Sequence, residues 1–171
     1  MPVTEEEKYQ FCPNCKNKLE RKVTDSEYHP ACSNCGFIFW NNPKPVVSII
    51  LSEDGGILML QRASEPLKDY WCLPGGFIRY GETPQDAIRR EVKEETGLSE
   101  IEIKGIVGAW RIDNDPRGIH IDIIYHGISK GELKLSSEDK TYAFYKPETL
   151  PKLIAYKHRE AVNDWFRNTT I

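Results

Sequence analysis

The sequence predicts an α/β (α+β) protein, in which a larger mixed domain follows a small cysteine-containing unit. Three observations support this prediction: two C-x2-C pairs near the start, several apolar strand-like runs, and two stretches with helical periodicity. We place the small unit at residues 1–41 and the larger domain at residues 42–171. The chain has 171 residues, which is enough for one main core and a small additional unit.

The small unit contains two cysteine pairs, Cys12 with Cys15 and Cys32 with Cys35. Their spacing is typical of a structural zinc site, in which four thiolates complete a tetrahedral shell around Zn²⁺. Two disulfides or a redox motif are the alternatives. A reducing cytoplasm disfavours the disulfides, and a redox motif does not need two copies. Since so short a segment buries little apolar surface, we expect Zn²⁺ to stabilise it as a zinc ribbon.

A β-hairpin is predicted at the start of the larger domain. Residues 46–51 are mostly apolar and indicate a buried strand, residues 53–56 indicate a turn, and residues 57–61 indicate the returning strand.

A helix is predicted between two clear end signals. Thr83 suits the N-cap, Pro84 the first helical position and Gly97 the C-terminal stop, while Asp86 completes a capping box.

Three glutamates, Glu91, Glu94 and Glu95, lie along one side of this helix at i, i+3 and i+4. The like-charge pair Glu91 and Glu95 alone destabilises a helix by about 0.2–0.5 kcal/mol. A solvated, salt-bridged helix is one interpretation of this pattern. The other is a divalent cation held by the three carboxylates, and oxygen ligands of this kind suit Mg²⁺ or Mn²⁺.

Further strands and a second helix are predicted after the first helix. Residues 101–112 and 119–129 indicate two strands joined by a loop, residues 141–146 indicate another strand, and residues 156–167 indicate an amphipathic helix. Its inward face carries Ala161, Val162, Trp165 and Phe166.

Alternation along the strand at 119–129 places His120, Asp122 and His126 on one face. These side chains form either a solvated face or the wall of a nucleotide pocket. Solvation is the commoner fate of such a face, and we favour it here.

The sequence resembles the Nudix hydrolase family in the region of the first helix. Gly76, Glu82 and residues 90–98 match every defined position of the family pattern G-x5-E-x7-R-E-U-x-E-E-x-G-U, where U is aliphatic. Residues 71–76 resemble the W-x-L-P-G-G lead-in of the family. With the cysteine unit, the chain is similar to the NADH pyrophosphatase and ADP-ribose pyrophosphatase group. This resemblance implies an α/β/α sandwich, with a mixed sheet between the two helices.

The resemblance also implies a metal site and a reaction. Glu91, Glu94, Glu95 and the carbonyl of Gly76 would bind Mg²⁺ or Mn²⁺, and the enzyme would hydrolyse the phosphoanhydride of a nucleoside diphosphate derivative.

Other residues receive supporting roles from the same resemblance. Arg90 would hold Glu94 or Glu91, and Glu82 would orient the cluster or bind a further ion. Glu138, in a polar loop, is a candidate base or extra metal ligand, beside Glu94 and Glu95.

For the substrate, we favour an ADP-ribose-like molecule first and NADH or a related dinucleotide second. The signature that NADH pyrophosphatases carry after the box is replaced here by residues 108–115. Trp110 and His120 are candidate substrate contacts. Arg62, at the end of a strand, either reaches a substrate phosphate or lies in solvent.

Composition limits the classes of partner. The net charge is −3 and no Lys/Arg stripe is present, so we do not expect nucleic acid as a ligand. No apolar run has the length of a membrane helix, and no secretory signal is recognised, so we expect a cytoplasmic protein. A homodimer is common among the relatives. A non-catalytic nucleotide sensor and an RNA-binding zinc-ribbon protein are the alternative functional classes.

Overall fold

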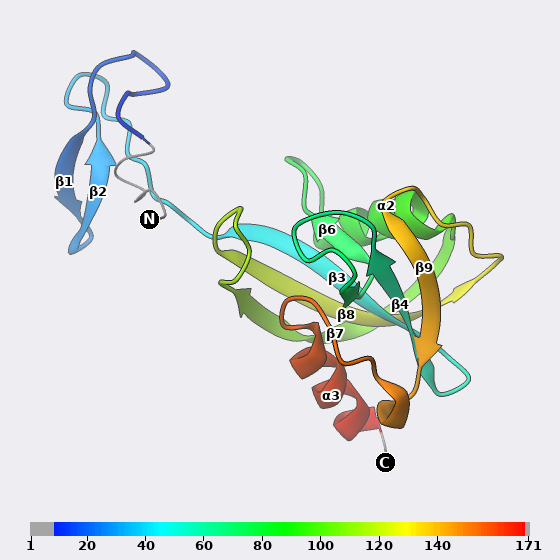
Figure 1. The fold of residues 1–171 in the computed structure, drawn as a ribbon. Helices are drawn as coiled ribbons and strands as arrows, with labels where there is room; N and C mark the ends of the chain where they lie inside the picture. The colour runs from blue at the N-terminus through cyan, green and yellow to red at the C-terminus, as the bar shows by residue number, and fades with distance from the viewer. Residues whose placement is uncertain (1–8, 170–171) are drawn as a thin grey trace. The chain divides into compact units, whose positions relative to one another are not determined.

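The larger part of the chain is built on one mixed β-sheet, and a short segment before it forms a separate hairpin (Figure 1). The computed structural model describes residues 9–169. It divides into two compact units, one ending at Asn42 and the other beginning at Pro43. The domain boundary predicted between residues 41 and 42 stays a prediction, and each unit is described by itself.

The first unit contains one antiparallel hairpin, formed by β1 (Glu20–Thr24) and β2 (Glu27–Ala31). Two cysteine-containing turns flank this hairpin in the sequence. Its small core consists of Cys12, Leu19 and Cys32, with Phe37 packed against them. Because this core contains so few apolar side chains, apolar packing alone gives the unit little stability, and a bond that joins the cysteines would supply the rest.

The sheet of the second unit has the strand order β5-β4-β3-β8-β7, with β6 paired to β3 and β9 paired to β4. Its strands are β3 (Lys44–Glu53), β4 (Gly56–Arg62), β5 (Trp71–Cys72), β6 (Gly75–Phe77), β7 (Glu100–Ile112), β8 (His120–Lys130) and β9 (Asp139–Tyr145). The pair β3 and β8 is parallel, and the other named pairs are antiparallel, so the sheet is mixed as predicted.

The strands β3 and β4 are joined only near their shared turn. Their register contains two pairs, Ser52 with Ile57 and Glu53 with Gly56. The first half of β3 pairs instead with the short strand β6 on that side. An opening therefore forms between the start of β3 and the end of β4.

Two helices, α2 (Pro84–Thr96) and α3 (His158–Thr169), cover opposite faces of the sheet. Alternation along β3 separates the two faces: Val47 and Ile49 join the core cluster with α2, and Ile50 joins the cluster with α3. A 3₁₀ turn, η1 (Pro147–Thr149), precedes α3. The predicted α/β/α sandwich is confirmed.

The predicted ends of α2 are also confirmed. The hydroxyl of Thr83 accepts a hydrogen bond from the backbone N–H of Asp86 at 3.2 Å. Gly97 adopts the left-handed conformation with φ of 73° and donates its backbone N–H to the carbonyl of Lys93. These caps fix where the helix begins and ends, so its side chains have a defined rotation toward the sheet. Within residues 9–169, no helix has the length and apolar character needed to cross a membrane.

Candidate active site

A cavity of about 480 Å³ occupies the opening between β3 and β4. Residues from the first half of β3, from β6 and from α2 line one part of it, and residues at the β4 and β9 ends line another. The predicted residues Gly76, Glu91 and Glu95 lie in its wall. So do Arg62, His120 and Glu138.

The backbone at Gly75 and Gly76 lies close to the carboxylates of two box glutamates. The backbone N–H of Gly75 donates a hydrogen bond of 3.0 Å to Oε2 of Glu95. A Cβ atom on Gly76 would lie 2.5 Å from Oε1 of Glu91, which is closer than van der Waals contact allows. Only glycine at position 76 therefore lets the Glu91 carboxylate keep its place.

The electrostatics of this wall suit a bound cation. Burial raises the pKa of Glu95 well above its usual range, and the nearby carboxylates Asp139, Glu91 and Glu138 raise it further. The Gly75 hydrogen bond opposes this shift. Several carboxylates directed into one cavity fit a hard divalent ion, which would neutralise their mutual repulsion.

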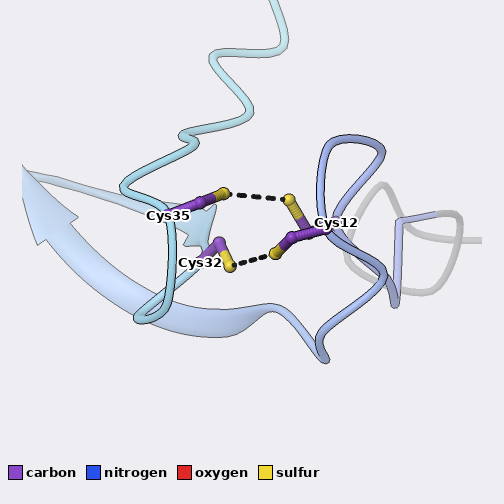
Figure 2. Close-up of side chains that lie close together, drawn as sticks. Cys12, Cys32 and Cys35 are labelled. Carbon is purple, nitrogen blue, oxygen red and sulfur yellow. Dashed lines mark hydrogen bonds between the residues drawn. The ribbon is translucent and has the colours of Figure 1, made fainter.

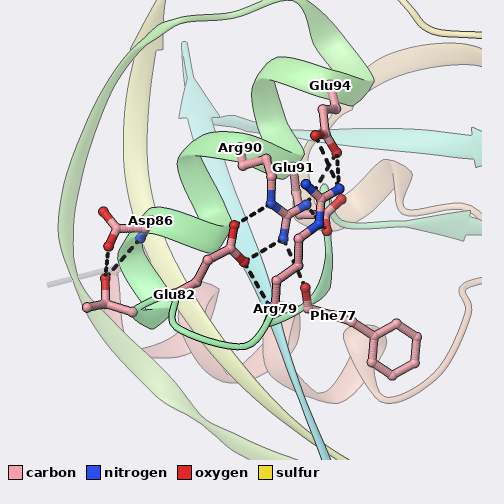
Figure 3. Close-up of polar contacts among 8 residues, drawn as sticks. Phe77, Arg79, Glu82, Asp86, Arg90, Glu91 and Glu94 are labelled. Atoms are coloured by element: carbon pink, nitrogen blue, oxygen red, sulfur yellow. Dashed lines mark hydrogen bonds and ion pairs between the residues drawn. The ribbon is translucent and has the colours of Figure 1, made fainter.

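Arg90 connects the glutamates of the box (Figure 3). It donates hydrogen bonds to both carboxylate oxygens of Glu82, at 2.6 and 2.8 Å, and to Oε1 of Glu91 at 2.5 Å. It also contacts Glu94 at 3.2 Å and the carbonyl of Phe77 at 3.0 Å. The hydrogen bonds from Arg90 and from the Arg79 backbone lower the pKa of Glu82 to about 2.

Glu94 differs in position from the other two box glutamates. Its side chain is 49% exposed and lies between Arg79, at 3.3 Å, and Arg90. Among the described residues, the wall of the cavity includes Glu91 and Glu95 but not Glu94. As a third ligand, Glu94 would therefore approach the ion from outside this wall, from its position beside Arg79 and Arg90.

The opposite rim carries Arg62, Glu138 and Asp139. Arg62 lines the cavity and donates from Nε to the carbonyl of Pro66 at 2.9 Å. Burial raises the pKa of Asp139 to about 6, with Arg62 opposing and Glu138 adding to the shift. Asp139 was missed in the sequence, where its neighbour Glu138 was chosen from the same polar loop.

The interpretation of the β8 face as solvated is wrong for His120 and Asp122. Each residue is 1% exposed, and both line the cavity. Phe77 packs against His120, and Ser48 and His158 contact Asp122, so other elements cover these side chains, which the alternating polar pattern could not reveal. His126, further along, is half-buried and does not appear in this wall.

Two residues that the sequence did not single out, Ser48 and His158, contact Asp122. Oδ2 of Asp122 accepts a hydrogen bond from the hydroxyl of Ser48 at 3.0 Å and lies 3.1 Å from Nε2 of His158. Ser48 was detectable as one polar residue inside an apolar strand. His158 gave no such signal, since a histidine at a helix start usually lies in solvent.

The loop between β7 and β8 adds a charged pair to the cavity wall that contains His120 and Asp122. Arg117 donates to both carboxylate oxygens of Asp115, at 2.7 to 3.2 Å. Burial alone would raise the pKa of Asp115, but the side-chain and backbone hydrogen bonds of Arg117 lower it to about 2. The Arg117 guanidinium lies 5.0 Å from the ring centre of Phe77.

Trp110 lies elsewhere. It is partly buried and packs against the core cluster that includes residues of α3. Trp110 is not among the described residues that line the cavity. Its predicted contact with substrate therefore has no support from its position.

The four cysteines of the first unit meet in one cluster. Their sulfur atoms all lie within 4.8 Å of one another (Figure 2), with Cys12 and Cys35 at 3.5 Å and Cys15 and Cys32 at 3.4 Å. Four sulfur atoms at such distances fit the tetrahedral shell of one Zn²⁺ ion. A backbone hydrogen bond at Asn17, with side-chain hydrogen bonds of Asn34 and Cys32, lowers the pKa of Cys15 to about 6. The Phe37 backbone hydrogen bond lowers the pKa of Cys35, but the Cys12 thiol and burial outweigh it and raise that pKa to about 12, so the four sulfur atoms share protons in the absence of an ion.

Comparison with known proteins gives one consistent family. A NUDIX domain model matches residues 42–166. The ADP-ribose pyrophosphatase of Methanocaldococcus jannaschii is 38% identical over 128 residues, which cover 74% of this chain and 75% of that protein.

Solved structures show the same fold. The crystal structure of a NUDIX hydrolase from Nitrosomonas europaea matches with a TM-score of 0.79 at 20% identity, covering 94% of this chain and 92% of that one. The NUDIX domain of Shewanella oneidensis NrtR, solved as a complex with ADP ribose, matches with a TM-score of 0.65 at 19% identity. That match covers 77% of this chain and 91% of the NrtR chain.

Proposed function

Because the chain belongs to the Nudix family of phosphoanhydride hydrolases, we propose that it hydrolyses ADP-ribose or a closely similar nucleoside diphosphate derivative in the cavity described above. The observation that carries this proposal is the meeting of Gly76, Glu91 and Glu95 in one wall of a cavity large enough for a nucleotide. The similarity to an ADP-ribose pyrophosphatase supports the choice of substrate.

Glu91, Glu95 and the Gly76 carbonyl are the proposed ligands of Mg²⁺ or Mn²⁺, with Glu94 joining them from its position beside Arg79. Such an ion supplies neutralisation of the diphosphate charge and acidification of a bound water. The raised pKa of Glu95 supports this assignment, because a carboxylate among other carboxylates favours a cation as its partner.

The residues of the chain have distinct parts in the proposed reaction. Arg90 holds the Glu91 carboxylate in place through a direct hydrogen bond, and Glu82 fixes Arg90 in turn. Arg62, on the opposite rim, would neutralise a substrate phosphate oxygen. Glu138 takes a proton from the attacking water. Asp139 beside it is a second candidate base, since its own pKa of about 6 is well matched to neutral pH.

The first unit, residues 1–41, is proposed to be a zinc ribbon, and residues 42–171 the hydrolase domain. Cys12, Cys15, Cys32 and Cys35 would fill the coordination shell of Zn²⁺, so the metal has a structural role there. We also propose a cytoplasmic location, because a reducing compartment preserves thiolate ligands.

A substrate panel tests the proposal. ADP-ribose, NADH, NAD, dinucleoside polyphosphates and nucleoside triphosphates are incubated with the enzyme in Mg²⁺ or Mn²⁺, and mononucleotide and phosphate products are quantified. We expect the highest kcat/KM with ADP-ribose, giving AMP and ribose 5-phosphate. Glu95→Gln is the inactive control. Binding without turnover of any substrate would instead favour a nucleotide sensor.

A further inference from the structure

Asp122 is held rigidly by two side chains from different elements. Its Oδ2 atom lies 3.0 Å from the Ser48 hydroxyl on β3 and 3.1 Å from Nε2 of His158 on α3. Nδ1 of His158 accepts the backbone N–H of Leu73 at 2.9 Å, so the ring proton sits on Nε2, which lies closer to Asp122 Oδ2 than to the Ser48 hydroxyl at 3.3 Å. Both neighbours therefore donate to the same oxygen, and the orientation of the carboxylate is fixed.

The other oxygen of this carboxylate has no such partner. Oδ1 of Asp122 is buried and makes no hydrogen bond to any of residues 9–169. The two ring nitrogens of His120, two residues earlier on the same face of β8, are in the same condition. The Asp115 carboxylate forms a long contact with that ring, with Oδ2 at 3.5 Å from Nε2. Buried polar atoms in native proteins are rarely left unpaired, so this group of atoms points to a ligand.

The surroundings suit a nucleoside. Asp122 and His120 line the same cavity as Glu91 and Glu95. The Phe77 ring lies 5.1 Å from the His120 ring, and Tyr156 also lines this cavity. Flat rings beside a fixed carboxylate are the combination that binds a base by stacking and a hydrogen bond.

We propose that Asp122 determines nucleoside specificity: its Oδ1 atom accepts a hydrogen bond from a donor on the nucleoside, either the exocyclic amino group of the base or a ribose hydroxyl. Ser48 and His158 are positioning residues, since they donate to Oδ2 and so fix the orientation of the carboxylate. This inference rests on the proposed use of the cavity as the substrate site, but it is independent of which bond is cleaved.

The substitution Asp122→Asn tests the polarity of this contact. The Ser48 and His158 donors keep the amide oxygen at the Oδ2 position, so the amide NH₂ replaces Oδ1 and a donor stands where an acceptor stood. A ligand amino group then meets a donor and loses its hydrogen bond. Asp113→Asn, an exposed change in the neighbouring loop, is the matched control.

Binding is measured by calorimetry in Mg²⁺ with ADP, IDP, 2′-deoxy-ADP and 3′-deoxy-ADP, which need no turnover. We expect at least one analogue to bind the unmodified enzyme about 10- to 100-fold more weakly than ADP, the range for a hydrogen bond to a charged group. If the base amine is the donor, Asp122→Asn weakens ADP by that factor but not IDP. If a hydroxyl is the donor, the variant weakens ADP and IDP alike, but not the matching deoxy analogue.

Other results overturn the inference. Equal affinity of the unmodified enzyme for all four nucleotides overturns it, and this result does not depend on whether the variant folds. An equal loss of affinity for all four nucleotides in Asp122→Asn overturns it as well. Lack of ADP binding by the unmodified enzyme also overturns it. If ADP-ribose is not hydrolysed but the analogues bind in the expected pattern, only the proposed function is overturned. If ADP-ribose is hydrolysed but the analogues do not bind in that pattern, only this inference is overturned.

Discussion

Arg90 donates two hydrogen bonds to Glu82, from Nε at 2.6 Å and from Nη2 at 2.8 Å, while its third nitrogen reaches Glu91 and Glu94. The Arg90 side chain is 15% exposed, so these bonds form largely out of water. One planar cation thus fixes three carboxylates relative to one another, and the geometry of the glutamate cluster depends on it.

The first prediction concerns this arginine. Arg90→Lys keeps the charge but cannot supply the same three directed donors. We expect kcat/KM for ADP-ribose to fall about 10- to 100-fold and the free energy of unfolding to fall by about 2–4 kcal/mol. Steady-state kinetics and urea unfolding measure both. Arg89→Lys, at the next and exposed position, is the control, and equal behaviour of the two variants would contradict the role of Arg90.

The second prediction concerns Glu95. Glu95→Gln should lower kcat by about 100-fold or more, because a metal ligand is lost. In buffer without Mg²⁺ or Mn²⁺ the same variant should be more stable than the parent. The raised pKa means that the folded protein keeps a proton that the unfolded chain has released, so the parent loses stability as the pH rises above the usual value of 4.5.

Thermal melts between pH 5 and pH 8 measure this difference. The stability gap between Glu95→Gln and the parent should widen as the pH rises, and added Mg²⁺ should narrow it. The exposed change Glu100→Gln should follow the parent throughout. A Glu95→Gln protein that is less stable than the parent at pH 8 would count against the cation site.

The third prediction concerns Gly76. An alanine there places a methyl group 2.5 Å from the Glu91 carboxylate, which has to move. Since the clashing atoms belong to the end of the Glu91 side chain and not to backbone, we expect the fold to persist while kcat/KM falls about 100-fold through misplacement of the ligand. Gly56→Ala, where the nearest atom to the new methyl lies at 3.4 Å, is the matched control and should retain activity.

The fourth prediction concerns pH and Asp115. Its pKa is lowered from the usual 3.8 to about 2, so its contribution to stability is present above pH 4 and is lost as the pH falls toward 2. Allowing for screening by water, we expect Asp115→Asn to cost about 1–2 kcal/mol at pH 7. Urea unfolding at pH 7 and pH 2.5 should show this deficit shrinking at the lower pH. A deficit that is constant with pH would mean that the Arg117 pair is not its source.

The fifth prediction concerns the cysteine cluster. Cys32→Ser should abolish the binding of one Zn²⁺ per chain, measured by elemental analysis, and unfold the small unit. Hydrolysis should remain within about threefold of the parent value, because every proposed catalytic residue belongs to the unit that begins at Pro43, which has its own core. The buried change Cys72→Ser, at a cysteine outside the cluster, should leave the zinc content unchanged.

Local signals account for the parts of the fold that the sequence predicted well. Thr83 and Gly97 act on their own helix through bonds to residues within four positions, so their effect is visible in a short window. The same holds for the turn between β3 and β4. The strand and helix patterns were also long enough to be recognised without their partners.

The candidate site depends on contacts that no short window contains. Asp122 is buried because Ser48, on the paired strand β3, and His158 approach it from two other elements. An alternating polar strand has the same pattern whether water or protein covers it. Trp110 illustrates the converse case, since it was a candidate substrate contact in the sequence but packs against the core instead.

The parallel pairing of β3 with β8 also has a kinetic consequence. Lys44 lies opposite His120 in this register, and the whole glutamate helix is encoded between them. Closing so long a loop is slow compared with forming a helix or a hairpin, since the chain loses conformational entropy on closure before the stabilising contacts between the two strands have formed. After dilution from denaturant, helical signal should therefore return before nucleotide binding does, and the delay reports when the centre of the sheet closes.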